Sequence, residues 1–401
     1  MVHKQPKSVV VVGAGVTGLS TAFHLAEKGV ERVTVVDKGT VGGGSSLQAA
    51  GIITMLLGEE QLVRARSVSL DLFERFGKLL DGYDFHQIGC VNLVSEKTLS
   101  KTESIREMQR RAGGHFEILQ GQELVERFPD VIAADSDCGV LDLRGGYSEP
   151  HKYVPALHRK LIEMGVEIRE NEPVVGFDVK NGMLTGVITE ETRLEADAAV
   201  CAVNAWANHV LSSVGYEIPM KNFIHERFVT KPFDKAPRIP VINDNVLEGY
   251  IRPTDDNRIL VGTGYHNPSQ YEISGSDFEV SSLEPNPDAL PFCKEQFVHR
   301  APMLEGAEWD YHTVGLISFA ADRKPVIGPV PGVDRLYVGT NFHSGGFAYN
   351  PVSGLLLAEH VVDGVTSIGS DVYSPDRFDG IDIKEFLEQE MTYNQVHSGR
   401  G

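Results

Sequence analysis

The first forty residues combine apolar runs with a helical pattern. Residues 8–12 form an uninterrupted β-branched run, which is typical of a strand covered on both faces of a parallel sheet. A glycine-rich turn and an amphipathic helical pattern follow, and Gly29 is a stop signal for that helix. A second apolar run at 33–36 ends at Asp37. This order predicts a β-α-β unit, the opening of a doubly wound nucleotide-binding fold.

The pattern then changes and later returns. Residues 85–145 contain short strands, a charged helix near 99–112 and loops rich in Gly and Asp, which indicate a separate layer. A helix at 153–164, a strand at 166–169 and a fully apolar strand at 198–203 again suit the nucleotide-binding fold. The chain is therefore expected to pass between two interleaved domains.

The second half of the chain shows alternating apolar and polar positions. Between 216 and 310, such segments are separated by Pro and Asp-Asn turns, which predicts an antiparallel sheet. A strand LYVGT, a loop NFHSGGF and a helix beginning at Pro351 are expected near the end. We predict an α/β fold in which a discontinuous Rossmann-like nucleotide-binding domain is interleaved with a second domain built on an antiparallel sheet (α+β). The predicted pieces are 1–84, 146–215 and 311–401 for the first domain, and 85–145 and 216–310 for the second.

Composition narrows the class of protein. Of 401 residues, 56 are acidic and 37 basic, and the resulting net charge of −19 repels nucleic acid. The four cysteines are widely spaced and form no C-x-x-C pair, so neither a disulfide framework nor a metal site is expected. The sequence contains no stretch of about 18 consecutive apolar residues. A cytoplasmic protein without a membrane span is predicted.

A phosphate-binding motif lies at the first join of strand and helix. Gly13, Gly15 and Gly18 form G-x-G-x-x-G, which lets the backbone approach a pyrophosphate at a helix N-terminus. Asp37 lies about twenty residues further on, at the end of the next strand, where a carboxylate can accept both ribose hydroxyls. These residues predict a bound dinucleotide.

Two further glycine clusters favour FAD over NAD. The segment GTVGGGSSLQAAGII follows Asp37, and NFHSGG precedes the last predicted long helix. Backbone N–H groups at a helix N-terminus can stabilise the negative charge that develops on a reduced flavin.

A family resemblance rests on motifs spread over nearly the whole chain. They are, in order, GAGVTGL, VVDK, GGGSSLQAAGI, VCAVNAWA, YIRPTDDNRILVGTG, DRKPVIGP and NFHSGGFAYNPVSG. With these motifs the chain resembles the D-amino-acid oxidase superfamily, which includes glycine oxidases, sarcosine oxidases and dimethylglycine dehydrogenases. The resemblance implies FAD and hydride transfer from a substrate C–H bond to the flavin. The segments ISFAAD and HERFVT look more like the dimethylglycine and sarcosine dehydrogenase branch.

The resemblance also implies contacts with the cofactor. In the VNAW segment, Asn204 stands where many relatives have glycine, and asparagine tolerates positive φ. The implied pyrophosphate contacts are Gly13, Gly15, Val16, Thr17 and Gly18; the ribose contacts are Asp37 and Lys38; the adenine contact is Val174; and the flavin contacts are Ser45, Ser46, Gln48, Ala50, Gly51, His343, Ser344, Gly345, Gly346 and Phe347.

Some relatives attach the flavin covalently through a cysteine or a histidine. The corresponding positions here are Gly315 and Gln48. Neither residue can form that bond, so non-covalent FAD is predicted.

The substrate pocket departs from the glycine oxidase pattern. Tyr250 and Tyr265 occupy its pocket-lining positions, but Ile317 stands in place of one carboxylate-binding arginine, and the second position falls near His343. His343 is the expected residue for tuning the flavin. The candidates for other polar contacts with the substrate are His225, Arg227, Arg252 and Arg323.

These observations predict an amine or amino-acid oxidase or dehydrogenase that acts on the carbon next to nitrogen. Oxidation of a 2-hydroxy acid is an alternative, because fold does not determine substrate. A flavin-binding regulatory subunit without turnover is another. The electron acceptor, oxygen or a redox carrier, and assembly into a homo-oligomer are left open.

Overall fold

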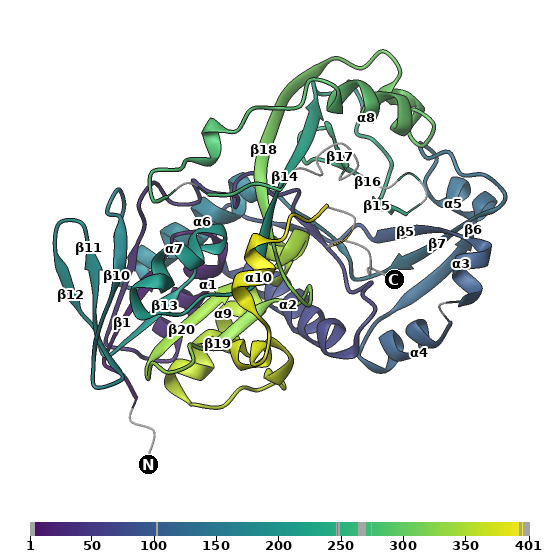
Figure 1. Ribbon diagram of the computed structural model, residues 1–401. Coiled ribbons are helices and arrows are strands. Elements are labelled where there is room, and N and C mark those ends of the chain that lie inside the picture. The colour runs from purple at the N-terminus through teal and green to yellow at the C-terminus, as the bar shows by residue number, and fades with distance from the viewer. Residues whose placement is uncertain are drawn as a thin grey trace.

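Two large sheets dominate the computed structural model, which describes residues 5–101, 103–245, 247, 249–263, 270–273, 275–392 and 395. The first sheet has six strands in the order β19-β20-β13-β1-β2-β9 (Figure 1). All its pairs are parallel except β19 with β20. The bounds are β1 Ser8–Val12, β2 Arg32–Val36, β9 Glu167–Arg169, β13 Ala198–Cys201, β19 Val326–Pro329 and β20 Leu336–Thr340.

Helices cover the six-stranded sheet and enclose its core. The helices α1 (Val16–Glu27), α6 (Pro150–Glu163) and α9 (Gly346–Val362) belong to the same apolar cluster as one face of β1 and β2. The other face packs beneath β10 (Val174–Lys180) and β11 (Met183–Thr189). The predicted β-α-β unit is confirmed as β1, α1 and β2.

The second large sheet has eight strands in the order β18-β14-β17-β16-β15-β5-β7-β6. Each neighbouring pair is antiparallel except β15 with β5. All its strands except β18 lie within the two segments predicted for the second domain, 85–145 and 216–310, and β18 begins in the second of these and continues beyond it. The interleaved fold class is confirmed. The bounds are β5 Cys90–Ser95, β6 Phe116–Gln120, β7 Asp137–Asp142, β14 Met220–Thr230, β15 Val241–Asp244, β16 Gly249–Pro253, β17 Ile259–Thr263 and β18 Trp309–Ala320.

The long strands β14 and β18 reach from the eight-stranded sheet towards the six-stranded one (Figure 1). The boundary predicted between residues 310 and 311 falls inside β18, and the division into domains stays a prediction. Shorter elements complete the fold: β3 Ile52–Ile53, β4 Phe85–His86, β8 Gly146–Ser148, β12 Arg193–Glu195, α2 Glu60–Leu79, α3 Glu96–Lys101, α4 Glu103–Arg111, α5 Gly121–Arg127, α7 Ala207–Leu211, α8 Ala289–Phe297, α10 Ile383–Glu388 and seven short 3₁₀ turns, of which η5 is His343–Gly345.

Two predicted helices differ in their bounds. The charged helix near 99–112 is two helices, α3 and α4. The helix expected to begin at Pro351 begins at Gly346, so the proline lies inside it. Proline has no N–H to donate to the Phe347 carbonyl, but Asn350 Nδ2 donates to that carbonyl instead at 2.5 Å. A local side-chain hydrogen bond therefore supports an interior proline, which the sequence pattern did not reveal.

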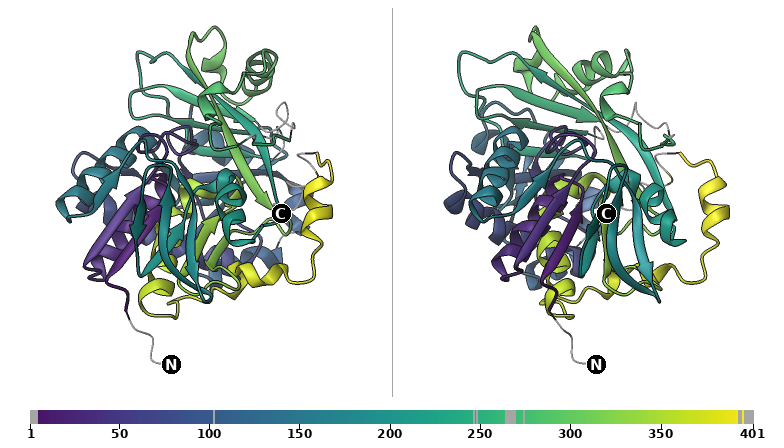
Figure 2. Two further views of the ribbon diagram at one scale, coloured as in Figure 1. Left: turned by 60° about the vertical axis from the view of Figure 1, so that its left-hand side comes forward. Right: turned by 90° about the vertical axis from the view of Figure 1, so that its left-hand side faces the viewer.

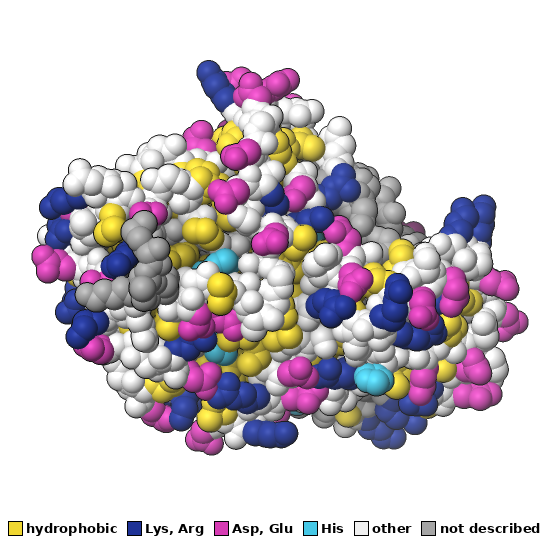
Figure 3. Space-filling model, turned by 90° about the horizontal axis from the view of Figure 1, so that it is seen from below, with side chains coloured by type: hydrophobic (Ala, Val, Ile, Leu, Met, Phe, Trp, Pro, Cys, Tyr) yellow, Lys and Arg dark blue, Asp and Glu magenta, His cyan; other side chains and the backbone are white. Residues whose placement is uncertain are grey.

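The outer surface mixes charges of both signs. Acidic and basic side chains are interspersed over the face shown in Figure 3. The segment around α10 lies on the outside in both views of Figure 2, where Lys221 Nζ donates to the Leu387 carbonyl at 2.6 Å. Among the described residues, none of the helices combines the length and apolar character needed to cross a lipid bilayer.

Candidate active site

A large cavity lies between the two sheets. Its volume is about 1270 Å³, and its lining runs from the glycine turn after β1 to polar side chains of the eight-stranded sheet. Pockets for drug-sized ligands measure roughly 300–1,000 Å³. The cavity is therefore large enough for an extended cofactor and a small second molecule.

The first glycine turn depends on close backbone packing. A Cβ atom on Gly13, whose φ is +107°, would lie 2.5 Å from the Ala202 carbonyl oxygen. One on Gly18 would lie 1.8 Å from the Gly13 carbonyl oxygen. Gly13, Gly15, Val16 and Thr17 line the cavity, whereas Gly18 does not. Gly18 thus brings α1 close to β1, which leaves the start of the helix facing the cavity.

Asp37 and Lys38 line the cavity just after β2. The Asp37 carboxylate accepts hydrogen bonds from the N–H groups of Ala14 at 2.6 Å and Gly39 at 2.8 Å. Burial raises the pKa of this carboxyl, while the two hydrogen bonds act in the opposite direction. Lys38 Nζ donates to the Ser276 carbonyl at 2.7 Å. The carboxylate is thus anchored at the position where a ribose contact was predicted.

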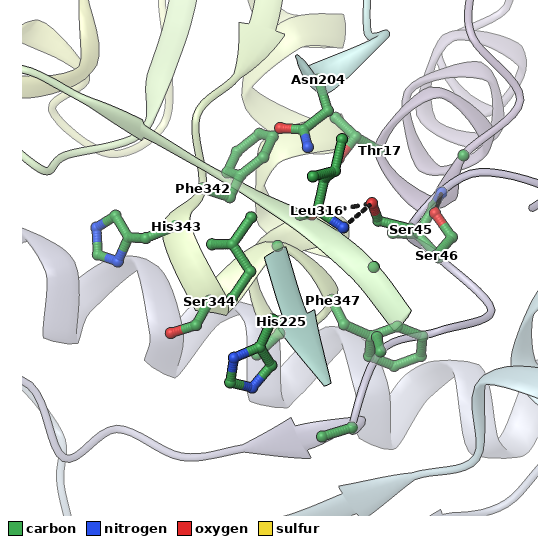
Figure 4. Close-up of a pocket in the computed structure, with 18 of the residues that line it drawn as sticks. Thr17, Ser45, Ser46, Asn204, His225, Leu316, Phe342, His343, Ser344 and Phe347 are labelled. Carbon is green, nitrogen blue, oxygen red and sulfur yellow. Dashed lines mark hydrogen bonds between the residues drawn. The ribbon is translucent and has the colours of Figure 1, made fainter. Parts of the chain in front are cut away.

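The segment 45–51 is fixed from both sides. Ser45 Oγ donates to the Leu316 carbonyl at 2.9 Å (Figure 4). Arg227 Nε donates to the Gln48 carbonyl at 2.7 Å, and Arg252 Nε to the Ala50 carbonyl at 2.6 Å. These two arginines were candidates for contacting substrate, but neither lines the cavity, because their guanidinium groups hold this loop instead. Ser45, Ser46, Gln48, Ala50 and Gly51 all line it.

The two positions associated with covalent attachment are neighbours. A Cβ atom on Gly315 would lie 3.4 Å from Gln48 Cβ. Both residues line the cavity, and neither carries a thiol or an imidazole. Neither position therefore offers a side chain that could bond to a flavin, and non-covalent FAD stays a prediction.

The turn before α9 forms another part of the cavity wall. His343 has a φ of +40°, and its ring lies parallel to that of Phe319, with 5.7 Å between centroids. His343 and Phe347 extend in opposite directions from this turn (Figure 4). His343, Ser344, Gly346 and Phe347 line the cavity. Gly345 does not, because Arg66 Nη2 occupies the place beside it: a Cβ on Gly345 would lie 2.5 Å from that nitrogen.

Polar side chains of the eight-stranded sheet face the cavity together. His225 Nε2 lies 3.1 Å from Tyr250 Oη, and the two rings are stacked with centroids 5.8 Å apart. Tyr250 reaches His225 across β17 because Gly262 has no side chain; a Cβ there would lie 2.2 Å from Tyr250 Oη. Next to Tyr250, Asn243 Nδ2 donates to Asn92 Oδ1 at 3.1 Å. The sheet thus offers both donors and acceptors to a bound molecule.

Most predicted site residues are brought together. Val174 also lines the cavity, and Asn204 has a φ of +43°, as expected at a tight turn. Tyr265 lies outside the described residues. Sequence reasoning missed Asn92 and Asn243, although a single polar residue within each apolar strand run was a signal. It also missed Phe319 and Arg66, whose positions depend on tertiary packing. Among the described residues, no group of His, Cys, Asp and Glu side chains is arranged to bind a metal ion.

The six-stranded sheet with its glycine turn is the fold of a dinucleotide-binding protein, and the cavity between the two sheets has room for such a cofactor. A family model described as "FAD dependent oxidoreductase" (DAO) matches residues 8–360. The chain belongs to this family, and it is an FAD-dependent enzyme. The resemblance predicted from the sequence is thereby confirmed.

Similar proteins carry related names. Glycine oxidase of Pseudomonas putida is 30% identical over 382 residues, covering 92% of this chain and 98% of that protein. The 4-methylaminobutanoate oxidase (formaldehyde-forming) of Paenarthrobacter nicotinovorans is 26% identical over 92% of this chain, which spans 45% of its length. The crystal structure of L-proline dehydrogenase from P. horikoshii superimposes with a TM-score of 0.85 and 25% identity, covering 93% of this chain and 97% of that one.

Proposed function

We propose that this protein removes a hydride from the carbon next to nitrogen in a small amine or N-substituted amino acid. The imine product then hydrolyses in water. Bound FAD supplies the hydride acceptor. The observation that carries the proposal is the His225–Tyr250 pair, which faces the cavity beside the loop 45–51 and Gly315.

The chain's own residues would position the substrate and handle its proton. The His225 imidazole and the Tyr250 hydroxyl share a hydrogen bond, and the pair would accept a further hydrogen bond from an N–H group of the substrate. Asn92 and Asn243 add amide groups on the same sheet face. Hydride transfer needs reacting atoms held about 3–3.5 Å apart, so orienting the substrate is the main task of this wall.

We also propose which residues hold the cofactor. The turn after β1 would bind the pyrophosphate, because it lines the cavity at the N-terminus of α1, and Asp37, which lines the cavity after β2, would bind the ribose. The loop 45–51 and the turn 343–347 would enclose the flavin ring from two sides. The five predicted segments would accordingly form an FAD-binding and a substrate domain.

The substrates named for the similar proteins support a nitrogen-bearing substrate. Glycine, 4-methylaminobutanoate and L-proline all carry an amine nitrogen next to a C–H bond. The pocket residue Ile317, which cannot bind a carboxylate as arginine does, separates this chain from the glycine oxidase pattern. A secondary or tertiary amine therefore suits the site better than glycine itself.

An anaerobic screen tests the proposal. The FAD-loaded protein is mixed with simple amines, N-methyl amino acids and 2-hydroxy acids, and loss of the flavin absorption band is followed. We expect bleaching by an N-methyl compound, with an aldehyde or keto acid and a less substituted amine as products. Bleaching by 2-hydroxy acids alone would replace the proposal with alcohol oxidation. A flavin that no compound bleaches would favour a regulatory subunit.

The same reaction mixtures address the electron acceptor. After anaerobic bleaching, the flavin is exposed either to oxygen or to an artificial electron carrier, and the return of its absorption band is timed. Reoxidation by oxygen at the turnover rate identifies an oxidase, whereas fast reoxidation only by the carrier identifies a dehydrogenase.

A further inference from the structure

Three arginines line the cavity among the described residues, and they differ in their partners. Arg106 pairs with Glu103 and donates to the Leu99 carbonyl at 2.8 Å. Arg323, which is half-buried, donates to the Gln395 carbonyl at 3.0 Å. The third, Arg66, is on α2.

Arg66 is a buried cation with unused donor capacity. Its exposed fraction is 5%, and its Nε has no acceptor among the described residues. Within that same part of the chain, no carboxylate lies at ion-pairing distance from it. Its guanidinium lies over the Tyr349 ring, 4.0 Å from the centroid. Burial lowers the pKa of this guanidinium. Buried charges are normally paired, so this arrangement indicates a missing anion.

Acidic groups that line the same cavity are already engaged elsewhere. Glu59 pairs with Lys324 at 2.7 Å, and Asp322 with Arg377 at 2.7 Å. Asp244 pairs with Arg300 at 2.7 Å. The positive charge of Arg66 would therefore be neutralised by a ligand that enters the cavity.

The surroundings of Arg66 suit a carboxylate. Its Nη2 lies beside Gly345, the N-cap residue of α9, where the helix dipole adds positive potential. A guanidinium can bind a carboxylate through two parallel hydrogen bonds. Leu56 and Leu62 also line the cavity and are buried, which strengthens a charge pair by excluding water.

We propose that Arg66 binds the substrate's carboxylate. This inference rests on the proposed function and narrows its substrate class to N-substituted amino acids. Arg66 would take the role that Ile317 cannot fill. Its place on α2, rather than on the eight-stranded sheet, would set which carboxylated amines reach the flavin productively.

Matched substrates and variants test the proposal. N-methylglycine, N-methyl-β-alanine and 4-methylaminobutanoate are each compared with the amino alcohol in which CH₂OH replaces the carboxylate. Flavin reduction is measured anaerobically for the wild type, Arg66→Met, Arg66→Lys and the control Arg64→Met. Arg64 lies on the same helix but is exposed and pairs with Glu60 at 2.6 Å.

We expect the wild type to prefer the best carboxylate over its alcohol in the ratio of reduction rate to Kd. Arg66→Met should reduce this preference by roughly 30-fold or more, because it removes one partner of a buried charge pair. Arg66→Lys should keep part of the preference, and Arg64→Met all of it. A wild type that reduces carboxylates and alcohols equally well would overturn the proposal and leave amine oxidation standing. The proposal would also be overturned if Arg66→Met lowered the ratio of reduction rate to Kd equally for the carboxylate and for its alcohol.

A binding measurement separates the inference from catalysis. Acetate is titrated into the oxidised holoenzyme, and the perturbation of the flavin spectrum gives its Kd. We expect Arg66→Met to weaken acetate binding by roughly 30-fold or more, whether or not any amine bleaches the flavin. Unchanged acetate binding, accompanied by a shift in FAD affinity or reduction potential, would assign Arg66 to the cofactor and refute the proposal.

Thermal unfolding of the apoprotein excludes a purely structural role. Removing a buried cation without an anionic partner should leave the unfolding temperature unchanged or raise it. A large decrease in the unfolding temperature of Arg66→Met, together with unchanged acetate binding in that variant, would overturn the proposal.

Discussion

At the scale of single residues, absent side chains shape the site as much as present ones. Gly345 leaves room for the Arg66 guanidinium, and Gly262 leaves room for the Tyr250 ring. Gly18 lets α1 approach the backbone of Gly13. Gly345 lies opposite a group that is far away in the sequence, whereas Gly262 and Gly18 lie opposite residues that are nearer along the chain. Their conformational freedom is secondary to the space that they leave open.

Gly262→Ala should separate Tyr250 from His225. The added methyl group would lie 2.2 Å from Tyr250 Oη, and the end of that ring can move away. We expect flavin reduction to slow by about tenfold or more, with a small change in stability, because a proton-handling pair is disrupted. Tyr250→Phe should have a similar effect. Single-turnover rates of both variants and the double variant check this: the effects should not add, and additive losses would contradict a shared cause.

His343 can be tested without disturbing its backbone. Its φ of +40° is strained for most residues, so asparagine is a better replacement than alanine. An imidazole that gains a proton beside the flavin favours the reduced, anionic form. His343→Asn should therefore lower the flavin reduction potential and slow reduction by substrate. Potentiometric titration checks this prediction, which an unchanged potential would refute.

At the scale of elements, a buried ion pair links the eight-stranded sheet to the loop 45–51. Arg252 on β16 binds both oxygens of Glu149, at 2.7 and 3.0 Å, and also the Ala50 carbonyl. Both side chains are almost fully buried. The pair joins the sheet to the residue before α6 and to the loop 45–51. Disturbing it should therefore affect stability and cofactor binding together.

Glu149→Ala should destabilise the protein by about 3–5 kcal/mol at neutral pH, because Arg252 would remain buried without its partner. Urea unfolding measures this change. Glu60→Ala is the control, since the exposed Glu60–Arg64 pair is expected to contribute less than about 1 kcal/mol. If both substitutions lowered the free energy of unfolding equally, the larger contribution expected from the buried Glu149–Arg252 pair would be refuted.

The ion pair also predicts a pH dependence. Burial raises the pKa of Glu149, but the charge and hydrogen bonds of Arg252 outweigh it, so the net pKa is lowered. A lowered folded-state pKa contributes stability above the unfolded value of about 4.3, and this is lost as the pH falls towards the folded pKa. The free energy of unfolding should therefore fall more steeply below about pH 4.3 in the wild type than in Glu149→Gln. If the free energy of unfolding depended on pH in the same way in both proteins, the predicted contribution of Glu149 would be refuted.

At the scale of the whole molecule, the cavity exists only where the two sheets meet. Residues from the first sixty positions, from the eight-stranded sheet and from the turn before α9 all line it. A ligand that contacts all three regions connects segments distant in the chain. FAD should therefore stabilise the assembled fold as a unit.

Removing and restoring FAD tests this coupling. Acid precipitation should release the flavin into the supernatant, because Gly315 and Gln48 provide no group for a covalent bond. Adding FAD at about 100 times its Kd should stabilise the apoprotein by about 2.7 kcal/mol and raise its unfolding temperature. Absorption of the supernatant and calorimetry of both forms measure these effects. Colour retained in the pellet would contradict non-covalent binding.

The sequence alone determined the β1-α1-β2 unit, the glycine turn within it, the place of Asp37 after β2 and the interleaved fold class, because these depend on local periodicity and on motifs at short spacing. The tertiary structure decided which side chains serve the cavity. Arg227 and Arg252 donate to the backbone of the loop 45–51. Arg66 lies beside Gly345, and Tyr250 contacts His225 across an intervening strand. Such contacts depend on how distant strands and helices pack, because a long polar side chain takes whichever partner the fold places within its reach.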